Sequence, residues 1–523
     1  MGSFGDFVVR ICLGLLSSSG VGAAPDEEAL FTPVAHDLPG RIVQVWPLSV
    51  SVCPDGEADL LVLHVEGSPP TARRIVTWMP CGAAARPDAA GSVTRTLPPE
   101  IVGIDVARIP GRAGPQLVSL SSRGLALDAL DAPSSDEPGT QRLHFPLPET
   151  LPLPPRPRLV TRIPMVDDWD STGRPSALVP SLAGAYLLDL QSGRARLLPL
   201  PLYADYDTWD PTIPAPAWSW LDQEVHWPAL MRADDDGDGR PDLFALARWA
   251  IWIYRTGPDG LPDTPSRRLE LVPFDAEAER RYQSTSQSAI VRDLDGDGRA
   301  DLLHTAVTGS LTRGRSSSRI HLGGSEGIDP STPAQATRET EGGFSSLHPV
   351  DLDGDGRPEL VELSLELGLF QLVRLLLTRR AETRIRVLEL DPKASAESSE
   401  GLRVVFEDDL SLQLDFGQGS ITGLMPGLGD WNGDGVQDLQ VPRGRGRIGF
   451  RLGSRQPGEP RLGAVFGEQP LPLRGGLGQS ADLDGDGLDE LIAFDATDPD
   501  APLVVLRNRG RLPGTPASLR ARP

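Results

Sequence analysis

The nonapeptide DLDGDGRAD, residues 293–301, decides the fold, because four close variants of it recur along the chain. They read DDDGDGRPD at 234–242, DLDGDGRPE at 351–359, DWNGDGVQD at 430–438 and DLDGDGLDE at 482–490. Each copy carries three or four carboxylates at its odd positions. Two such charges ~4 Å apart repel by roughly 1 kcal/mol in water and about 4 kcal/mol near a protein surface. The pattern therefore predicts that each copy is a loop that binds a cation.

The ligand chemistry of these loops favours Ca²⁺. Hard oxygen donors without His or Cys suit this ion, which takes six to eight oxygens in a flexible cage. We expect side chains one, three and five to point inward, residue seven to supply a backbone carbonyl, and residue nine to close the cage with a carboxylate. The glycine at position six permits the positive φ that bends the loop around the ion. About five Ca²⁺ sites are predicted, with the ligands Asp234, Asp236, Asp238, Arg240, Asp242, Asp293, Asp295, Asp297, Arg299, Asp301, Asp351, Asp353, Asp355, Arg357, Glu359, Asp430, Asn432, Asp434, Val436, Asp438, Asp482, Asp484, Asp486, Leu488 and Glu490.

The residues after each loop exclude an EF-hand, which needs a bidentate acid at position twelve and helices on both sides. The twelfth positions hold Ala245, His304, Glu362, Val441 and Ala493. A short apolar run follows each ninth residue, as in LFALA from Leu243 and LIAF from Leu491, and Gly or Pro bounds these runs closely. Runs of this length are typical of β-strands. Each loop is therefore expected to link two strands.

The spacing of the loops predicts a repeat architecture. Their ninth residues recur about every 50 to 80 residues, which favours propeller blades or stacked sheets of about four strands each. Weaker copies lie upstream. DWDSTGRPS at 168–176 keeps Asp168 and Asp170 as weak metal ligands, SVCPDGEAD at 51–59 keeps Asp55 and Asp59, and residues 105–116 retain only strand, Gly-rich turn and strand. The chain thus holds eight units.

The repeat resembles the FG-GAP family, also described as VCBS repeats, which occurs in the integrin alpha-subunit head and in many secreted bacterial proteins. The resemblance is carried by the five loops, by the apolar strands before them (SAIVRDLDGDG from Ser288, HPVDLDGDG from His348) and by the Leu-led strands after them. It implies an all-β, seven- or eight-bladed β-propeller of four-stranded blades, with Ca²⁺ in the loop between the first and second strands of most blades. The first three units depart from the motif, so we expect packing alone to hold them.

The predicted organisation has three parts. Residues 1–23 are a secretory signal peptide, 24–510 the propeller and 511–523 a short tail. The units lie near 45–95, 100–150, 160–200, 228–285, 288–340, 345–415, 425–470 and 478–510, and residues 27–35 are expected to supply the last strand of the final unit. Two polar or Pro-rich stretches, 137–159 and 379–401, are interpreted as a rim connection and a solvent-exposed extension.

The first residues and the cysteines indicate the compartment. Arg10, an apolar stretch at 11–21 and small residues before an acidic start fit a signal peptide; the alternative is an additional buried strand. Cys12 would leave with it, so Cys53 and Cys81 remain as an even pair. A disulfide between them would stabilise a unit whose metal loop is weak, and two reduced core cysteines are the alternative. We expect a secreted, periplasmic or cell-surface protein.

Charge and motifs exclude several functions. The formal net charge of −23, without a basic stripe, disfavours nucleic acid and anionic membranes. No segment after the signal region approaches 18 continuous apolar residues, so direct membrane insertion is not expected. The GGSEG stretch at 323–327 matches a hydrolase nucleophile elbow, but the sequence after it cannot start the required helix. No catalytic residue is predicted, and the five-fold repetition of the acid pairs points to metal binding.

An aromatic insertion between the third and fourth units is the strongest candidate for ligand binding. Such rings can stack on sugars or anchor a protein partner; alternatively they fill a gap between blades or plug the ring. The residues are Tyr203, Tyr206, Trp209, Trp218, Trp220 and Trp227. Two functions remain open: a non-catalytic, calcium-stabilised protein that binds a protein or glycan on a propeller face, and a lectin-like or polysaccharide-degrading protein that uses residues 203–227.

Overall fold

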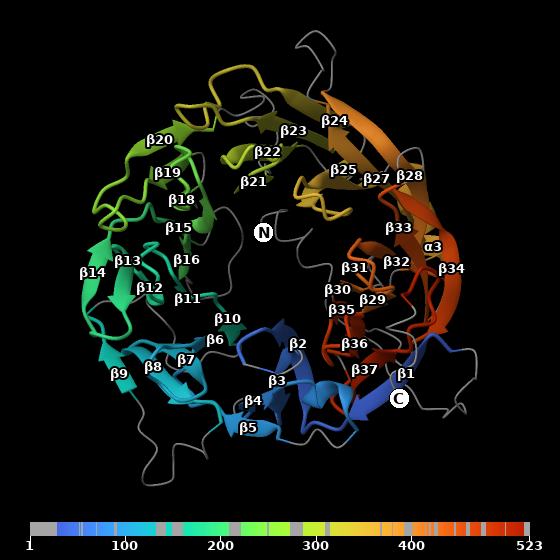
Figure 1. Ribbon diagram of the computed structural model, residues 1–523, viewed down its shortest axis with the longest axis horizontal. Coiled ribbons are helices and arrows are strands. Elements are labelled where there is room, and N and C mark those ends of the chain that lie inside the picture. The colour runs from blue at the N-terminus through green and yellow to red at the C-terminus, as the bar shows by residue number, and fades with distance from the viewer. Residues whose placement is uncertain are drawn as a thin grey trace.

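Eight antiparallel β-sheets form a ring in the computed structural model, so the chain is an all-β, eight-bladed propeller of mostly four-stranded blades (Figure 1). The expected choice between seven and eight blades is thereby settled at eight. The structure describes residues 29–51, 53, 56–68, 71–87, 91–131, 143–148, 160–208, 221–247, 250–271, 286–308, 314–341, 343–366, 369–378, 380–391, 401–413, 415–417, 420–422, 427–443, 446–456, 461–471, 477–496 and 498–516.

The first four blades follow one another along the chain. Blade 1 contains β2 (Arg41–Leu48), β3 (Asp59–Glu66), β4 (Arg73–Met79) and β5 (Val93–Thr96), with the 3₁₀ turn η2 (Ala83–Ala85). Blade 2 contains β6 (Gly103–Arg108), β7 (Pro115–Ser121), β8 (Gly124–Ala129) and β9 (Leu143–Pro146), with β10 (Thr161–Arg162) parallel to β6. Blade 3 contains β11 (Val166–Asp167), β12 (Ser176–Ser181), β13 (Gly184–Asp189) and β14 (Ala195–Leu198). Blade 4 contains β17 (Ala229–Ala233), β18 (Asp242–Ala247), β19 (Ala250–Tyr254) and β20 (Arg267–Glu270).

The other four blades complete the ring. Blade 5 contains β21 (Ser286–Arg292), β22 (Asp301–Thr308), β23 (Arg315–His321) and β24 (Ala336–Glu341). Blade 6 contains β25 (Gly343–Val350), β26 (Glu359–Glu366), β27 (Arg380–Leu390) and β28 (Leu402–Gln413). Blade 7 contains β31 (Gly427–Gly429), β32 (Asp438–Pro442), β33 (Arg447–Gly453) and β34 (Leu462–Pro470). Blade 8 contains β35 (Leu477–Ala481), β36 (Glu490–Phe494), β37 (Leu503–Asn508) and β1 (Phe31–His36).

Within the described residues, three insertions interrupt this regular order. The hairpin β15 (Tyr203–Thr208) and β16 (Leu221–His226) lies between blades 3 and 4, the helix α3 (Leu369–Thr378) between β26 and β27, and the hairpin β29 (Asp415–Gly417) and β30 (Ser420–Thr422) between blades 6 and 7. Antiparallel order places the loops after the first and third strands of every blade at one face of the ring. The connections after the second and fourth strands, and hence all three insertions, belong to the opposite face.

The hydrophobic core lies between the blades. Successive side chains of a strand point to opposite faces, so β3 sends Leu60 and Val62 towards blade 8 and Leu61 and Leu63 towards blade 2. The buried clusters of the described residues fall at the eight junctions between neighbouring blades. A blade is therefore apolar on both faces, and it is stable only with neighbours on both sides.

The N-terminal strand closes the ring, as the sequence predicts. β1 pairs with β37 in antiparallel register from Phe31 opposite Asn508 to His36 opposite Leu503. Phe31 is 1 % exposed, and its ring lies 5.4 Å from that of Phe450 in blade 7. Blade 8 thus joins the two ends of the described chain, which Figure 1 shows as blue β1 beside red β37.

Two interpretations of the sequence were wrong. Within the stretch assigned to a rim connection, Leu143–Pro146 forms β9, the fourth strand of blade 2. Within the supposed solvent-exposed extension, Arg380–Leu390 forms β27, whose Ile385 and Val387 are buried. In both cases the apolar residues of the described part of the stretch complete a sheet.

Several predicted features lie outside the described residues. They are the signal peptide, the end of the tail from 517, Asp55, Trp209, Trp218 and Trp220. Within the aromatic insertion, Tyr203 stacks on His226 at 4.3 Å, and Trp227 packs against the cluster between blades 3 and 4. Tyr206 belongs to β15. Among the helices of the described ranges, none is long and apolar enough to cross a membrane.

Replacing Phe31 with Ala should weaken the closure of the ring. Truncation of a buried Phe costs about 3–5 kcal/mol, so the urea midpoint of unfolding should fall clearly, as measured by circular dichroism. Thr32→Ala on the exposed side of the same strand is the matched control, with an expected change within about 0.5 kcal/mol. Equal midpoints for wild type and F31A would contradict closure through β1.

Candidate metal centres

Each acidic loop joins the first and second strands of its blade, and its first aspartate organises it through backbone hydrogen bonds. In blade 4, Gly237 N donates to Asp234 Oδ1 at 2.6 Å and Gly239 N donates to Asp234 Oδ2 at 2.7 Å. Both glycines have positive φ, 77° and 84°, which costs glycine little. Equivalent bonds reach Asp293, Asp351, Asp430 and Asp482.

The ninth-position carboxyl group is buried at the base of each loop. Asp242 is 1 % exposed and accepts hydrogen bonds from Asp235 N at 2.8 Å and from Thr256 N at 2.6 Å. Burial nevertheless raises its pKa to about 6. The same cause raises the pKa of Asp301, Glu359 and Asp438 to about 7 and that of Glu490 to about 9. Since a nearby cation favours the ionised form of an acid, these buried acids fit a positively charged ligand.

Four loops bring three carboxylates together, with ligand oxygens within 4.8 Å of one another. Blades 4 and 8 combine positions one, three and nine, whereas blades 5 and 6 combine positions one, three and five. The groups are Asp234, Asp236 and Asp242; Asp482, Asp484 and Glu490; Asp293, Asp295 and Asp297; and Asp351, Asp353 and Asp355. In blade 8, the Oδ1 atom of Asp484 is buried and has no hydrogen-bond partner among the described residues. Buried polar atoms usually have a partner, so this oxygen fits the role of a metal ligand. These groups could each hold a metal ion.

The hydrogen bonds of the other predicted ligands differ between the loops. In blade 7, Asn432 replaces the third acid, and its Nδ2 donates to Asp434 at 3.0 Å. In each of the five acidic loops, the aspartate at position five accepts a hydrogen bond from the backbone N–H of the residue at position seven. The acceptors are Asp238, Asp297, Asp355, Asp434 and Asp486, and the donors are Arg240, Arg299, Arg357, Val436 and Leu488. Position five thus lies beside the seventh residue, whose carbonyl remains a predicted ligand.

Backbone hydrogen bonds join neighbouring loops into a belt, which the sequence did not reveal. The eighth-position N–H of one loop donates to a carbonyl at the start of the preceding loop. The pairs are Ala300 to Asp234, Gln437 to Leu352, Asp489 to Asp430 and Ala58 to Asp482, at 2.7, 2.7, 3.0 and 3.3 Å. Pro241 and Pro358 stand at position eight in blades 4 and 6, and proline has no N–H to donate. The belt therefore cannot include these two bonds.

Asp235 is a second residue that the motif analysis missed. The second position is a buried apolar residue in the other four loops, Leu294, Leu352, Trp431 and Leu483. Asp235 is fully buried instead, and it accepts hydrogen bonds from Arg255 Nη2 at 2.7 Å and Arg267 Nη1 at 3.0 Å. Both arginines also donate to the carbonyl of Glu326 in blade 5. An acid at an otherwise apolar position was the available signal, and its role is to clamp blade 4 to blade 5.

The weak loop of blade 3 keeps the shape of the others. Thr172 N and Gly173 N both donate to Asp168 at 2.9 Å, and Thr172 Oγ1 donates to Asp170 at 2.8 Å. At position nine, Ser176 offers a hydroxyl group where the other loops have a carboxylate. The structure therefore brings the two predicted weak ligands together without the acid that would close a cage.

Blade 1 holds a disulfide at the place where blades 4 to 8 have their acidic loops. Cys53, at the third loop position, is bonded to Cys81, so the disulfide alternative is confirmed. Asp59, at position nine, accepts hydrogen bonds from Ser51 N at 2.8 Å and Cys81 N at 3.0 Å. Cys81 thus corresponds to Thr256 of blade 4, which donates to the ninth acid there. The covalent bond ties the loop to the end of the third strand, and a bond that closes such a segment contributes about 3 kcal/mol.

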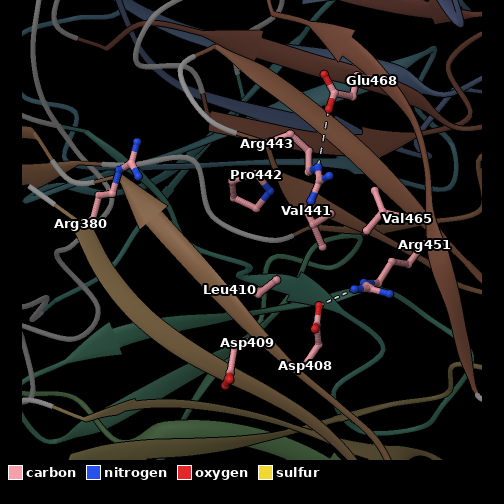
Figure 2. A pocket seen from close by; sticks show the side chains of 10 residues that line it. All are labelled: Arg380, Asp408, Asp409, Leu410, Val441, Pro442, Arg443, Arg451, Val465 and Glu468. Atoms are coloured by element: carbon pink, nitrogen blue, oxygen red, sulfur yellow. Dashed lines mark hydrogen bonds and ion pairs between the residues drawn. The ribbon is translucent and has the colours of Figure 1, made fainter.

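A groove of about 380 Å³ lies between blades 6 and 7 (Figure 2). It lies toward the face opposite the acidic loops, because its lining includes Arg380 at the start of β27 and Pro442 at the end of β32. Leu410, Val441, Pro442 and Val465 form its apolar wall, and its charged residues are Arg380, Asp408, Asp409, Arg443, Arg451 and Glu468. Figure 2 shows Arg451 directed at Asp408 and Arg443 at Glu468, the latter pair 3.8 Å apart. The groove is mixed in charge and chemically separate from the metal loops.

Comparison with known proteins supports the repeat. The family model described as FG-GAP-like repeat matches residues 234–304 and 293–362, which contain the loops of blades 4, 5 and 6. A solved structure of the Photorhabdus luminescens Tc holotoxin pore is 14% identical, covers 91% of this chain and 27% of its own, and has a TM-score of 0.20. The chain thus spans about a quarter of that protein's length, and this TM-score supports no further argument. Comparison with curated proteins gave no match.

Glu490→Gln should remove part of the pH dependence of stability in the presence of a chelator. The folded-state pKa of Glu490, about 9, lies above the ordinary value of 4.5. The stability linked to its proton is therefore present below about pH 4.5 and is lost as pH rises through about 9. In EGTA, the urea midpoint of wild type should fall more steeply between pH 5 and pH 9 than that of E490Q.

Glu468→Gln is the control for this measurement, since Glu468 is exposed and pairs with Arg447 at the surface. Its midpoint should follow the wild-type pH dependence. Parallel curves for wild type and E490Q would show that Glu490 ionises normally in the folded protein.

Proposed function

Because the chain carries FG-GAP-like repeats within an eight-bladed β-propeller, we propose that it is a secreted, calcium-stabilised scaffold that binds another macromolecule and catalyses no reaction. The observation that carries the proposal is the pairing of clustered loop carboxylates with a buried ninth acid whose pKa is raised. Only a cation held by the loop would make full ionisation of such a cluster favourable.

The donor set supports calcium as the proposed cation. Every predicted side-chain ligand offers oxygen, and the loop backbone is already folded around its first aspartate. Ca²⁺ accepts six to eight oxygens at varied angles, whereas Mg²⁺ demands an octahedron and Zn²⁺ favours nitrogen and sulfur. Side chains one, three, five and nine and the seventh carbonyl would hold each ion, which supplies positive charge and no chemistry of reaction.

The ions have a structural role in this proposal. Four pairs of neighbouring loops are joined by the eighth-position hydrogen bond, as from Ala300 to Asp234. An ion that fixes one loop therefore also fixes its neighbour. A ring whose blades are held in this way presents a rigid surface, and a rigid surface binds a partner with little loss of conformational entropy.

The opposite face is the better candidate for partner binding. It receives the hairpin β15–β16, the helix α3 and the hairpin β29–β30, and the groove of Figure 2 lies toward it. Binding residues commonly lie on such connections, since the scaffold positions them without depending on their sequence. We expect a protein or a glycan as the partner, and neither nucleic acid nor direct membrane insertion.

The disulfide of blade 1 supports an extracytoplasmic location. Disulfides persist in oxidising compartments and are rare in the cytosol. Together with the signal-like segment at residues 1–23, the bond between Cys53 and Cys81 favours a secreted, periplasmic or cell-surface protein. The carbohydrate alternative uses the aromatic residues of 203–227, of which Trp209, Trp218 and Trp220 lie outside the described residues.

Calcium should raise the thermal stability of the chelator-treated protein. At a hundredfold excess over its dissociation constant, each ion adds about 2.7 kcal/mol to the stability of the folded state. Addition of millimolar CaCl₂ after EGTA should therefore raise the Tm by many degrees in calorimetry, and MgCl₂ should have a much smaller effect. Asp482→Asn should reduce this rise, while Asp263→Asn, on a surface ion pair with Arg196, should leave it unchanged. A Tm indifferent to calcium would refute the proposal.

Calcium-loaded full-length protein should capture a protein or glycan partner from its native secretome, and EGTA should weaken the capture because the ring loses rigidity. Crosslinking and mass spectrometry would map the contacts, which are expected on β15–β16, α3 or β29–β30. Incubation with polysaccharides is the test of the non-catalytic assignment. Release of soluble products, or crosslinks confined to the metal-loop face, would contradict the proposal.

A further inference from the structure

At several junctions of the described residues, the turn between the third and fourth strands of one blade covers the acidic loop of the blade before it. Ile328 N of blade 5 donates to Asp235 of blade 4 at 3.3 Å. The segment after β37 covers blade 7 in the same way, where Asn432 Nδ2 donates to Pro513 O at 3.5 Å. The covering turn therefore determines which additional groups approach each cluster of carboxylates.

At the junction of blades 6 and 7, the covering turn brings an arginine into the acidic loop. Arg461, the residue before β34, forms an ion pair with Asp353 through Nη1, and its Nη2 lies 3.5 Å from Glu359 Oε1. The same guanidinium donates from Nε to Glu389 Oε1 at 2.9 Å. It thus contacts the third and the ninth carboxylates of the blade 6 loop, both of which are predicted calcium ligands.

The turn itself is anchored to the loop that it covers. Arg455 Nε donates to the carbonyl of Asp353, and Arg455 Nη2 donates to the carbonyl of Gly435 at 2.7 Å. Asp353 is buried, and its other carboxylate oxygen accepts a hydrogen bond from Asp355 N at 3.2 Å. The contact of Arg461 with Asp353 is therefore part of a packed interface between two blades.

The residue before the fourth strand is uncharged in blades 1, 4, 5 and 6, whereas Arg142 and Arg194 stand there in blades 2 and 3, which do not follow a blade with one of the five acidic loops. Ser266 precedes β20, Gln335 precedes β24 and Gly401 precedes β28, as Arg461 precedes β34. In blade 8, Arg507 donates to Asp484 at 2.7 Å, but the triad with Asp482 and Glu490 stays assembled around the free oxygen of Asp484. Among the described acidic loops, the loop of blade 6 is the one in which a single guanidinium contacts both the third-position and the ninth-position carboxylate.

We propose that Arg461 is the resident cation of blade 6, and that this loop excludes Ca²⁺ while the loops of blades 4, 5, 7 and 8 bind it. The inference rests on the calcium-binding function proposed above. A calcium ion and the guanidinium would need the same oxygens of Asp353 and Glu359. They would also repel each other with twice the energy of two unit charges at that distance, so occupation by one displaces the other.

The number of calcium ions per chain tests this proposal. Native mass spectrometry and equilibrium dialysis with ⁴⁵Ca should find four ions in wild-type protein and five in Arg461→Gln, which removes the charge and frees both carboxylates. Arg461→Lys keeps a positive charge and should retain four. Arg447→Gln, which breaks a surface ion pair with Glu468 in the same blade, is the control and should also retain four.

The outcomes separate this inference from the proposed function. Five ions in wild type, or equal counts in wild type and R461Q, would overturn the role of Arg461 while leaving calcium binding intact. No ions in either protein would overturn both. A crystal of wild type grown in CaCl₂ gives the answer without a variant: anomalous scattering should locate calcium in the other loops and none between Asp353 and Glu359, and a peak there would refute the inference.

Discussion

Buried carboxylates at the junction of the first and second strands are the constraint on which the ring depends. Each ninth-position acid, such as Glu490, accepts backbone hydrogen bonds that fix the loop to its blade, yet its burial makes the charged form unfavourable. The chain meets this constraint differently from blade to blade. Blade 1 substitutes a disulfide between Cys53 and Cys81, and blade 3 replaces the ninth acid with Ser176. The remaining acidic loops need a positive charge from an ion or from the protein itself.

The consequences extend beyond one loop, because blades contact each other through the loops as well as through the core. Hydrophobic clusters hold the blades face to face, but such packing lacks direction and tolerates small rotations. The bonds from one loop to the next, and the clamp of Arg255 and Arg267 on Asp235, fix the angle between neighbours at one end. Closure by β1 then makes the ring circular, so a change of angle at one junction must be shared by the others.

The sequence predicted the features that depend on neighbouring residues. A nine-residue loop with fixed acids and glycines specifies its own backbone, and the alternating apolar runs after it specify strands. The five loops and the repeat could therefore be predicted from the sequence. Contacts between residues far apart in the chain could not be predicted in this way. Arg461 and Asp353 are separated by 108 residues. Glu362, which binds Arg338 and Arg386 in a buried ion network, was considered only as the one acid at the twelfth position of an EF-hand pattern. Strand β27 was missed because cross-strand ion pairs, such as Arg384 with Asp409, make its exposed face highly charged.

The two faces of the ring differ in how freely their sequence can change. At the face that carries the acidic loops, one residue often makes several hydrogen bonds. The carboxylate of Asp430, for example, accepts hydrogen bonds from its own loop, and its backbone N–H donates to Asp489 of the next blade. An insertion there would separate ligands and break the belt. Among the described residues, the strand ends at the other face carry no comparable group of three acids, and it is there that α3, β15–β16 and β29–β30 are inserted. A ring stabilised at one face can therefore acquire binding residues at the other without loss of stability, which is why we propose that a partner binds opposite the predicted ion sites.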